Sequence, residues 1–202
     1  MPTEASGIRL EIRIALNPPL IDIHYRLSNE TDRSHGAFCR LPTTALDGMT
    51  VYLPGTAYVA IDNDTAQLKK MVLETPPGLQ VAVRLLPGVM LIPAHGSLTE
   101  RISRTLPLAV EDPYRQAQLV GKAGGKPVMP AAPVDIAAVS LSIGVFECAG
   151  DEKYTPVSPA YPDVFTVAPS GGAVMRQVVL TASARLEAPI SGLDYGPAPP
   201  PP

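Results

Sequence analysis

The first thirty residues alternate between apolar and polar side chains with a period of two. From Gly7 to Leu16 and again from Pro19 to Ser28, every second residue is Ile, Leu or Tyr, and most residues between them are charged or polar. An extended chain turns successive side chains to opposite faces, so this period predicts strands with one face on a core and one in water. The polar run 28–32 favours a turn, because such side chains bond their own backbone.

Strand patterns recur along the rest of the chain, with turn signals about every 8–12 residues. The predicted strands are 35–41, 56–61 and 66–74 as a hairpin, 79–86, 89–92, 97–106 as an edge strand, 134–147, 164–168 and 173–186. Turn dipeptides and prolines mark 42–55 and 154–163 as loops. Asp112 followed by Pro113 predicts a short helix that ends near Gly121.

These segments predict an all-β fold, an immunoglobulin-like antiparallel β-sandwich with long loops. Their connections are too short for the crossover helices that a parallel sheet needs. We expect residues 1–188 to form one domain. Residues 189–202 end in GPAPPPP and lose the apolar pattern, so they are predicted to be a disordered, proline-rich tail.

Composition and charge exclude several classes of function. The 202 residues include 24 prolines, which is roughly twice the typical share of about 5%. The formal net charge is −3 with no run of like charges, which argues against nucleic-acid binding and against a polybasic membrane anchor. No apolar run is long enough to span a membrane, and the N-terminus lacks a signal-peptide pattern. We therefore expect a cytoplasmic protein, or one whose leader has been removed.

The two cysteines, Cys39 and Cys148, are far apart in the sequence. In an oxidising compartment they would be candidates for a disulfide between the sheets. Without a visible leader, two free and partly buried thiols are the simpler interpretation.

No motif for nucleophilic catalysis, phosphate binding or metal binding occurs in the chain. If the strand from residue 35 folded beside the second strand, His24, His35 and Cys39 would approach one another, as a metal site requires. The simpler interpretation places His24 on a polar strand face, and His35 and His95 in turns before glycines. We therefore predict no enzyme, and no catalytic, cofactor-binding or metal-ligating residue.

Without a predicted catalytic or metal site, the function is expected to depend on binding at the protein surface. We predict a non-enzymatic protein that binds another protein, as an assembly or inhibitory component, with no nucleic acid and no membrane as partner. The apolar run Leu85–Ile92 is expected to be core at a hairpin, and it is the leading partner surface if part of it is exposed. The alternative is a small-ligand or carbohydrate-binding sandwich that uses loop tyrosines and the excursion 107–133.

Overall fold

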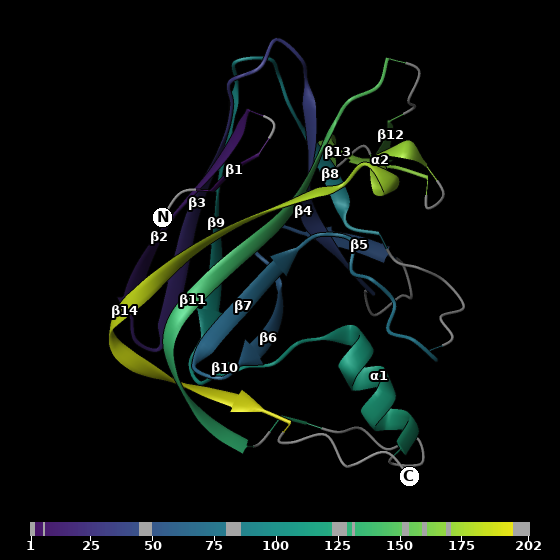
Figure 1. Cartoon of the computed structure of the whole chain (residues 1–202). Helices are drawn as coiled ribbons and strands as arrows, with labels where there is room; N and C mark the ends of the chain where they lie inside the picture. The colour runs from purple at the N-terminus through teal and green to yellow at the C-terminus, as the bar shows by residue number, and fades with distance from the viewer. Residues whose placement is uncertain are drawn as a thin grey trace.

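The structure is a computed structural model that describes residues 3–5, 7–44, 50–79, 86–122, 129–130, 132–150, 154–158, 161–168 and 171–195. Strands dominate these residues and form two sheets, which pack face to face around a shared core (Figure 1). The all-β prediction is confirmed.

Sheet A contains β1 (Thr3–Ala5), β2 (Ile8–Asn17), β3 (Leu20–Asn29) and β9 (Ser97–Thr105), in the order β1-β2-β3-β9. All its strand pairs are antiparallel. The strands predicted from the alternating pattern of the first thirty residues are β2 and β3, within one residue at each end. Among the strands that the structure describes, β9 pairs only with β3, so it is an edge strand there, as its imperfect alternation indicates.

Sheet B follows the order β10-β14-β11-β4-β8-β13-β12, with β5 beside β4 and the hairpin β6–β7 beside β11. Its strands are β4 (His35–Thr44), β5 (Thr50–Leu53), β6 (Tyr58–Asp62), β7 (Thr65–Lys70), β8 (Gly88–Ile92), β10 (Leu108–Ala109), β11 (Ala132–Glu147), β12 (Thr155–Ser158), β13 (Tyr161–Thr166) and β14 (Val178–Asp194). The strand β11 is central. It pairs with β14 along most of its length on one side, and with β7 and then β4 on the other.

The prediction of a purely antiparallel fold was wrong. The strand β7 runs parallel to β11, and β10 runs parallel to β14. The connection between β7 and β11 supplies the length that a parallel pair needs, because it includes β8, β9 and the helix α1 (Pro113–Lys122). Short connections between sequence neighbours therefore did not determine which strands pair.

Two segments predicted as loops contain short strands. The predicted loop 42–55 holds β5, which pairs with the end of β4 around Pro42, and 154–163 holds β12 and the start of β13. These strands were not predicted because they contain or adjoin prolines, which cannot donate a backbone hydrogen bond to a neighbouring strand. Edge strands nevertheless tolerate proline. The predicted strand 79–86 lies mostly outside the described residues.

The predicted start of the disordered tail at residue 189 was also wrong. The strand β14 continues to Asp194, because Ile190 is buried in the core while Gly192 and Leu193 pair with β10. Residues 196–202 lie outside the described part. At its other end, β14 starts later than predicted, since the short helix α2 (Gly172–Met175) occupies the start of the predicted strand.

The core lies between the two sheets. Buried side chains of sheet A, including Leu10, Ile23 and Leu27, belong to one cluster with Leu68 and Leu141 of sheet B. A smaller cluster forms around the rings of Phe38 on β4 and Phe146 on β11. It also includes Val89 of β8 and Ala173 of α2. The apolar run that ends at Ile92 is mostly core, as its first interpretation predicted. Leu86, Val89 and Ile92 are buried and Leu91 is 37% exposed, while Leu85 lies outside the described residues.

Candidate functional site

The solvent side of sheet A gathers arginines from three strands. Residues that pair across strands point to the same face, so the register places Arg13, His24 and Arg101 in one row across β2, β3 and β9. We call this side the arginine face. Its charged members on β2, β3 and β9 are Arg9, Glu11, Arg13, Asp22, His24, Arg26 and Arg101.

The acidic members of the arginine face are already paired. Glu11 lies 2.9 Å from the guanidinium of Arg9, and Asp22 lies 3.4 Å from that of Arg101. Within the described part of the chain, no acidic side chain forms an ion pair with Arg13, His24 or Arg26. The face therefore carries an excess of positive charge, although the whole chain has a formal charge of −3.

The row of Arg13, His24 and Arg101 is not explained by folding stability. Arg13 and Arg101 flank His24 on the two neighbouring strands, and among the described residues only Arg101 of the two arginines has an acidic partner. A local choice with no evident stabilising contact is expected mainly where a surface has a function. The row therefore marks the arginine face as the candidate functional site.

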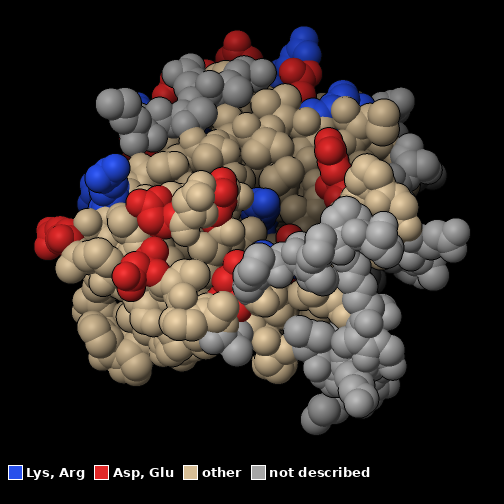
Figure 2. Space-filling model, turned by 60° about the horizontal axis from the view of Figure 1, so that its bottom comes forward, with Lys and Arg blue, Asp and Glu red and all other residues tan. Residues whose placement is uncertain are grey.

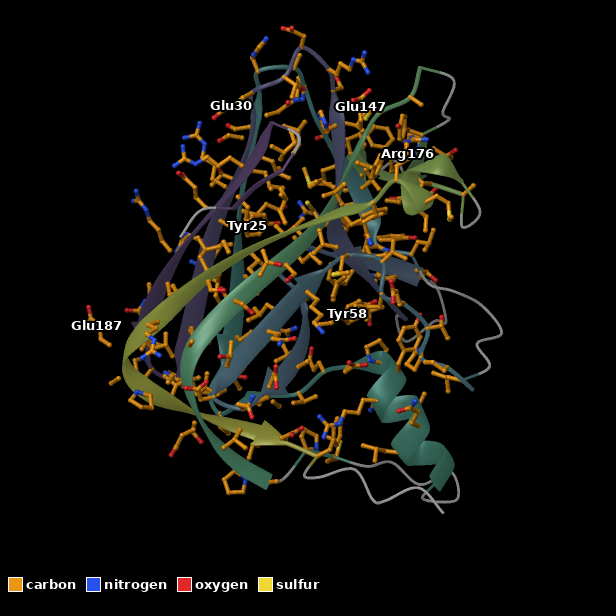
Figure 3. All side chains as sticks on the ribbon, viewed as in Figure 1. Tyr25, Glu30, Tyr58, Glu147, Arg176 and Glu187 are labelled. Carbon is orange, nitrogen blue, oxygen red and sulfur yellow. The ribbon has the colours of Figure 1, made fainter. Side chains whose placement is uncertain are left out.

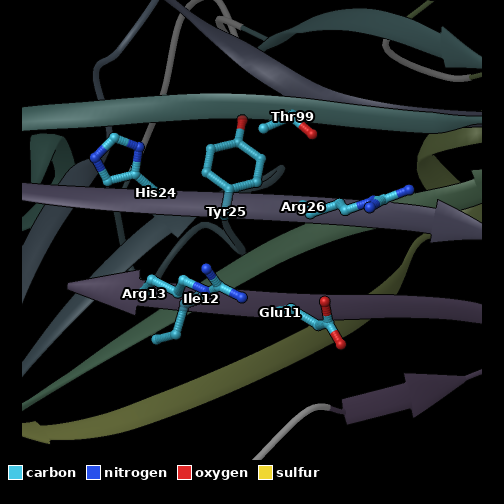
Figure 4. A pocket seen from close by; sticks show the side chains of 7 residues that line it. All are labelled: Glu11, Ile12, Arg13, His24, Tyr25, Arg26 and Thr99. Atoms are coloured by element: carbon cyan, nitrogen blue, oxygen red, sulfur yellow. The ribbon is translucent and has the colours of Figure 1, made fainter.

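A hollow of about 500 Å³ opens on the arginine face (Figure 4). It is lined by Glu11, Ile12, Arg13, His24, Tyr25, Arg26 and Thr99. Figure 4 shows that the polar side chains around it come from β2, β3 and β9. An anionic side chain entering this hollow would meet the guanidinium groups of Arg13 and Arg26.

A buried polar network lies on the inner side of the same strands. The ammonium of Lys70 has no exposed surface, donates to the carbonyl oxygen of Cys39 at 2.6 Å and lies 3.5 Å from Glu100 Oε2. The Glu100 carboxylate also accepts a hydrogen bond from Tyr25, which Figure 3 shows between the sheets, and forms an ion pair with Arg40. The network connects β3 and β9 of sheet A to β4 and β7 of sheet B.

Burial sets the protonation chemistry of this network. It lowers the pKa of Lys70, raises the pKa of Tyr25 well above its usual value, and raises the pKa of the Cys39 thiol to about 11. A reactive cysteine needs a lowered pKa and access to solvent, and Cys39 has neither. The arrangement suits a connection between the sheets rather than nucleophilic chemistry.

A second hollow, of about 570 Å³, lies between α1 and the segment after β7. Its lining residues are Lys69, Met71, Leu73, Glu74, Pro76, Asp112, Tyr114, Arg115 and Gln118.

Helix α1 starts as predicted, because Asp112 Oδ1 accepts hydrogen bonds from the backbone N–H groups of Tyr114 and Arg115. An ion pair of 2.9 Å between Arg115 and Asp194 holds α1 to the end of β14. Figure 2, which brings the lower end of the molecule forward, shows many acidic side chains there.

The structure does not bring the predicted histidine and cysteine candidates together. His24 lies on the solvent side of sheet A, whereas Cys39 is buried in the core. His35 is buried on β4, with Nδ1 3.2 Å from the carbonyl oxygen of Arg33. His95 lies in a turn and pairs with Asp32 at 2.8 Å. Cys39 and Cys148 form no disulfide within the described part of the chain, as the simpler interpretation predicted.

Sequence reasoning missed both the arginine face and the buried network. The signal for the face was the i, i+2 spacing of Arg9, Glu11 and Arg13 and of His24 and Arg26, but the net charge of the chain concealed it. The signal for the network was Lys70, which shares the period of two with the apolar Leu68 and therefore points inward.

Comparison of the chain with protein-family models, with curated proteins and with solved structures finds no match. Among the described residues, neither helix has the length and apolar character needed to cross a membrane.

Proposed function

We propose that this chain is a non-enzymatic binding protein that docks an acidic segment of another protein on its arginine face. Such docking suits an assembly or inhibitory component. The observation that carries the proposal is the row of Arg13, His24 and Arg101, in which Arg13 and His24 have no acidic partner among the described residues. Arg–carboxylate hydrogen bonds are charge-assisted and are often bidentate, so an acidic side chain gains most at such a row.

A short acidic segment fits this surface better than a nucleic acid does. Proteins that bind duplexes often neutralise about 6–10 phosphates. The arginine face offers four arginines, and Arg9 and Arg101 are already paired with Glu11 and Asp22. The acidic side chains at the lower end of the molecule would repel a long polyanion that extends to them more than a short acidic segment that stays on sheet A (Figure 2).

The proposal extends to architecture and location. Two packed sheets with one free, charged face support an immunoglobulin-like sandwich as the architecture. Cysteines that are not joined by a disulfide in the described part of the chain suit a reducing compartment, which supports a cytoplasmic location.

Charge reversal on the arginine face tests the proposed function. A fluorescein-labelled peptide rich in Asp and Glu is expected to bind saturably in a fluorescence anisotropy titration. The double variant Arg13→Glu, Arg26→Glu is expected to weaken binding by at least about tenfold, because each reversal replaces an attraction between exposed charges, worth about 0.2–1 kcal/mol, with a repulsion of similar size. The matched control is Arg185→Glu, an exposed arginine on β14 of sheet B.

Three outcomes contradict the proposal. The wild-type protein does not bind the peptide, or Arg185→Glu weakens binding as much as the double variant, or duplex DNA of equal charge binds more tightly than the peptide. The last result would assign the arginine face to nucleic acids.

The hollow beside α1 supports a second candidate function, small-ligand or carbohydrate binding. Its volume of about 570 Å³ lies within the range of small-molecule sites, and Met71, Leu73, Pro76 and Tyr114 provide apolar walls. A thermal-shift screen against sugars and small organic acids separates the two functions. A ligand that raises Tm for the wild type but not for Tyr114→Ala would support this hollow. No shift with any compound would leave the arginine face as the proposed site.

A further inference from the structure

We propose that the arginine face recognises an extended segment in which acidic residues occupy every second position. This inference rests on the proposed function and adds the spacing of the acidic residues that the face selects. It follows from the positions of the cations, which the sheet register fixes.

The basic side chains of this face are spaced by the geometry of β3 and its neighbours. His24 and Arg26 are two residues apart on β3, so their Cα atoms are about 6.6–6.8 Å apart. Arg13 and Arg101 flank His24 on the two adjacent strands, each about 4.8 Å away. Arg26 is flanked instead by Glu11 and Thr99. The basic side chains thus lie in two rows, two residues apart along β3.

An extended peptide matches this spacing. Its side chains on one side are also about 6.6–6.8 Å apart, so two acidic residues at i and i+2 reach the two rows together. The first meets the row of Arg13, His24 and Arg101, and the second meets Arg26 beside the hydroxyl of Thr99. A helical segment does not fit in the same way, because its i, i+2 side chains do not face the same direction.

Fixed acidic residues limit the favourable region. Asp22 lies on β3 two residues before His24, and Glu11 is the β2 partner of Arg26. Both would repel a carboxylate placed over them. The hollow of about 500 Å³ has Glu11 on one side and Arg13, His24 and Arg26 in the rest of its polar lining, so a carboxylate is favoured only away from Glu11. The face therefore favours acidic residues in a particular spacing, as well as negative charge in general.

Two peptides of equal composition test this inference. Each contains two aspartates in a run of threonines: in the alternating peptide the aspartates are two residues apart, and in the block peptide they are adjacent. Threonine favours extended backbone in both. In the extended alternating peptide both aspartates reach one side, whereas in the block peptide one of them faces away. In fluorescence anisotropy titrations, we expect the alternating peptide to bind the wild-type protein at least about tenfold more tightly, which corresponds to about 1.4 kcal/mol.

The variant Arg26→Gln removes one of the two rows. It is expected to abolish the preference for the alternating peptide, while Arg185→Gln, on sheet B, retains it. Equal affinity of the wild-type protein for the two peptides would overturn the inference and leave the proposed function standing, since net charge alone would then govern docking. Failure of both peptides to bind would overturn the inference and the proposed function together.

Discussion

Replacing Glu100 by glutamine is expected to lower the free energy of unfolding by about 3–5 kcal/mol, the usual cost of removing one partner from a buried ion pair. Glutamine keeps the shape of the side chain but not its charge. The substitution leaves the cations of Lys70 and Arg40 without a counter-ion, although the Lys70 side chain is fully buried and that of Arg40 only 13% exposed. Because domains are typically stable by 5–15 kcal/mol, the loss would be visible as a large fall in the urea midpoint.

A second substitution in the network distinguishes the loss of charge from the loss of packing. Lys70→Met fills a similar volume and removes the cation that burial penalises, while Glu100 keeps Arg40 and Tyr25 as partners. The substitution leaves the buried carbonyl oxygen of Cys39 without its donor, but Glu100 retains a cationic partner, so we expect a loss of about 1–3 kcal/mol, smaller than for Glu100→Gln. The double variant Glu100→Gln, Lys70→Met should then be more stable than Glu100→Gln alone.

Glu147→Gln is the matched control. Its partner Arg33 is exposed, and exposed ion pairs add little to stability, so the urea midpoint should stay near that of the wild type. The interpretation fails if the two substitutions at Glu100 and Lys70 simply add, or if the Glu147 variant loses as much stability as the Glu100 variant.

The sequence predicted those strands that have one face in the core and one in water. In β2 and β3 the apolar residues fall at every second position, and the predicted and observed ends differ by one residue. Helix α1 was also predicted, because its cap is local: the Asp112 side chain bonds backbone N–H groups two and three residues ahead. These features depend on residues that are close in sequence.

Features that depend on pairing between distant segments were missed. The parallel contact of β7 with β11 joins Thr65 to Ala138, and neither strand carries a local sign of its neighbour's direction. The end of β14 contains a single strongly buried apolar residue, Ile190, so its continuation to Asp194 depends on contacts with β10 and β11. Periodicity within one segment contains no information on such contacts.

The arginine face was missed for the same reason. Arg13, His24 and Arg101 become neighbours only through the registers of β2 with β3 and of β3 with β9. The net charge of −3 averages this face with the acidic side chains elsewhere on the surface. The absence of a run of like charges in the sequence therefore excluded a continuous basic segment. It gave no information on whether basic residues from different strands meet on one face of a sheet.

Replacing Asn29 by aspartate is expected to destabilise the protein more than replacing it by alanine. The Asn29 amide is 2% exposed, and its Nδ2 donates to the carbonyl oxygens of Arg33, Pro93 and Ile92 at 2.7, 2.8 and 3.3 Å. Its Oδ1 accepts from the backbone N–H and the hydroxyl of Thr31. One side chain therefore joins the turn after β3 to the turn before β9.

Alanine removes these bonds and leaves buried carbonyls without their donor, at a cost of about 2–4 kcal/mol if each unsatisfied group costs about 1–3 kcal/mol and water reaches some of them. Aspartate keeps the shape but replaces the donor with a charged acceptor, which faces the same three carbonyl oxygens. Repulsion then adds to the lost hydrogen bonds, so Tm and the urea midpoint should fall further than for alanine.

Asn63 provides the matched control, because Asn29 and Asn63 both begin an Asn-X-Thr triplet. Asn63 lies in the exposed β6–β7 turn with φ of 54°, a conformation that Asp also tolerates. We expect Asn63→Asp to leave the urea midpoint almost unchanged. If Asn29→Asp were as stable as the wild type, the three donated hydrogen bonds would not hold the two turns together. The same burial predicts that a glycosylation enzyme would modify Asn63 in the folded protein but not Asn29.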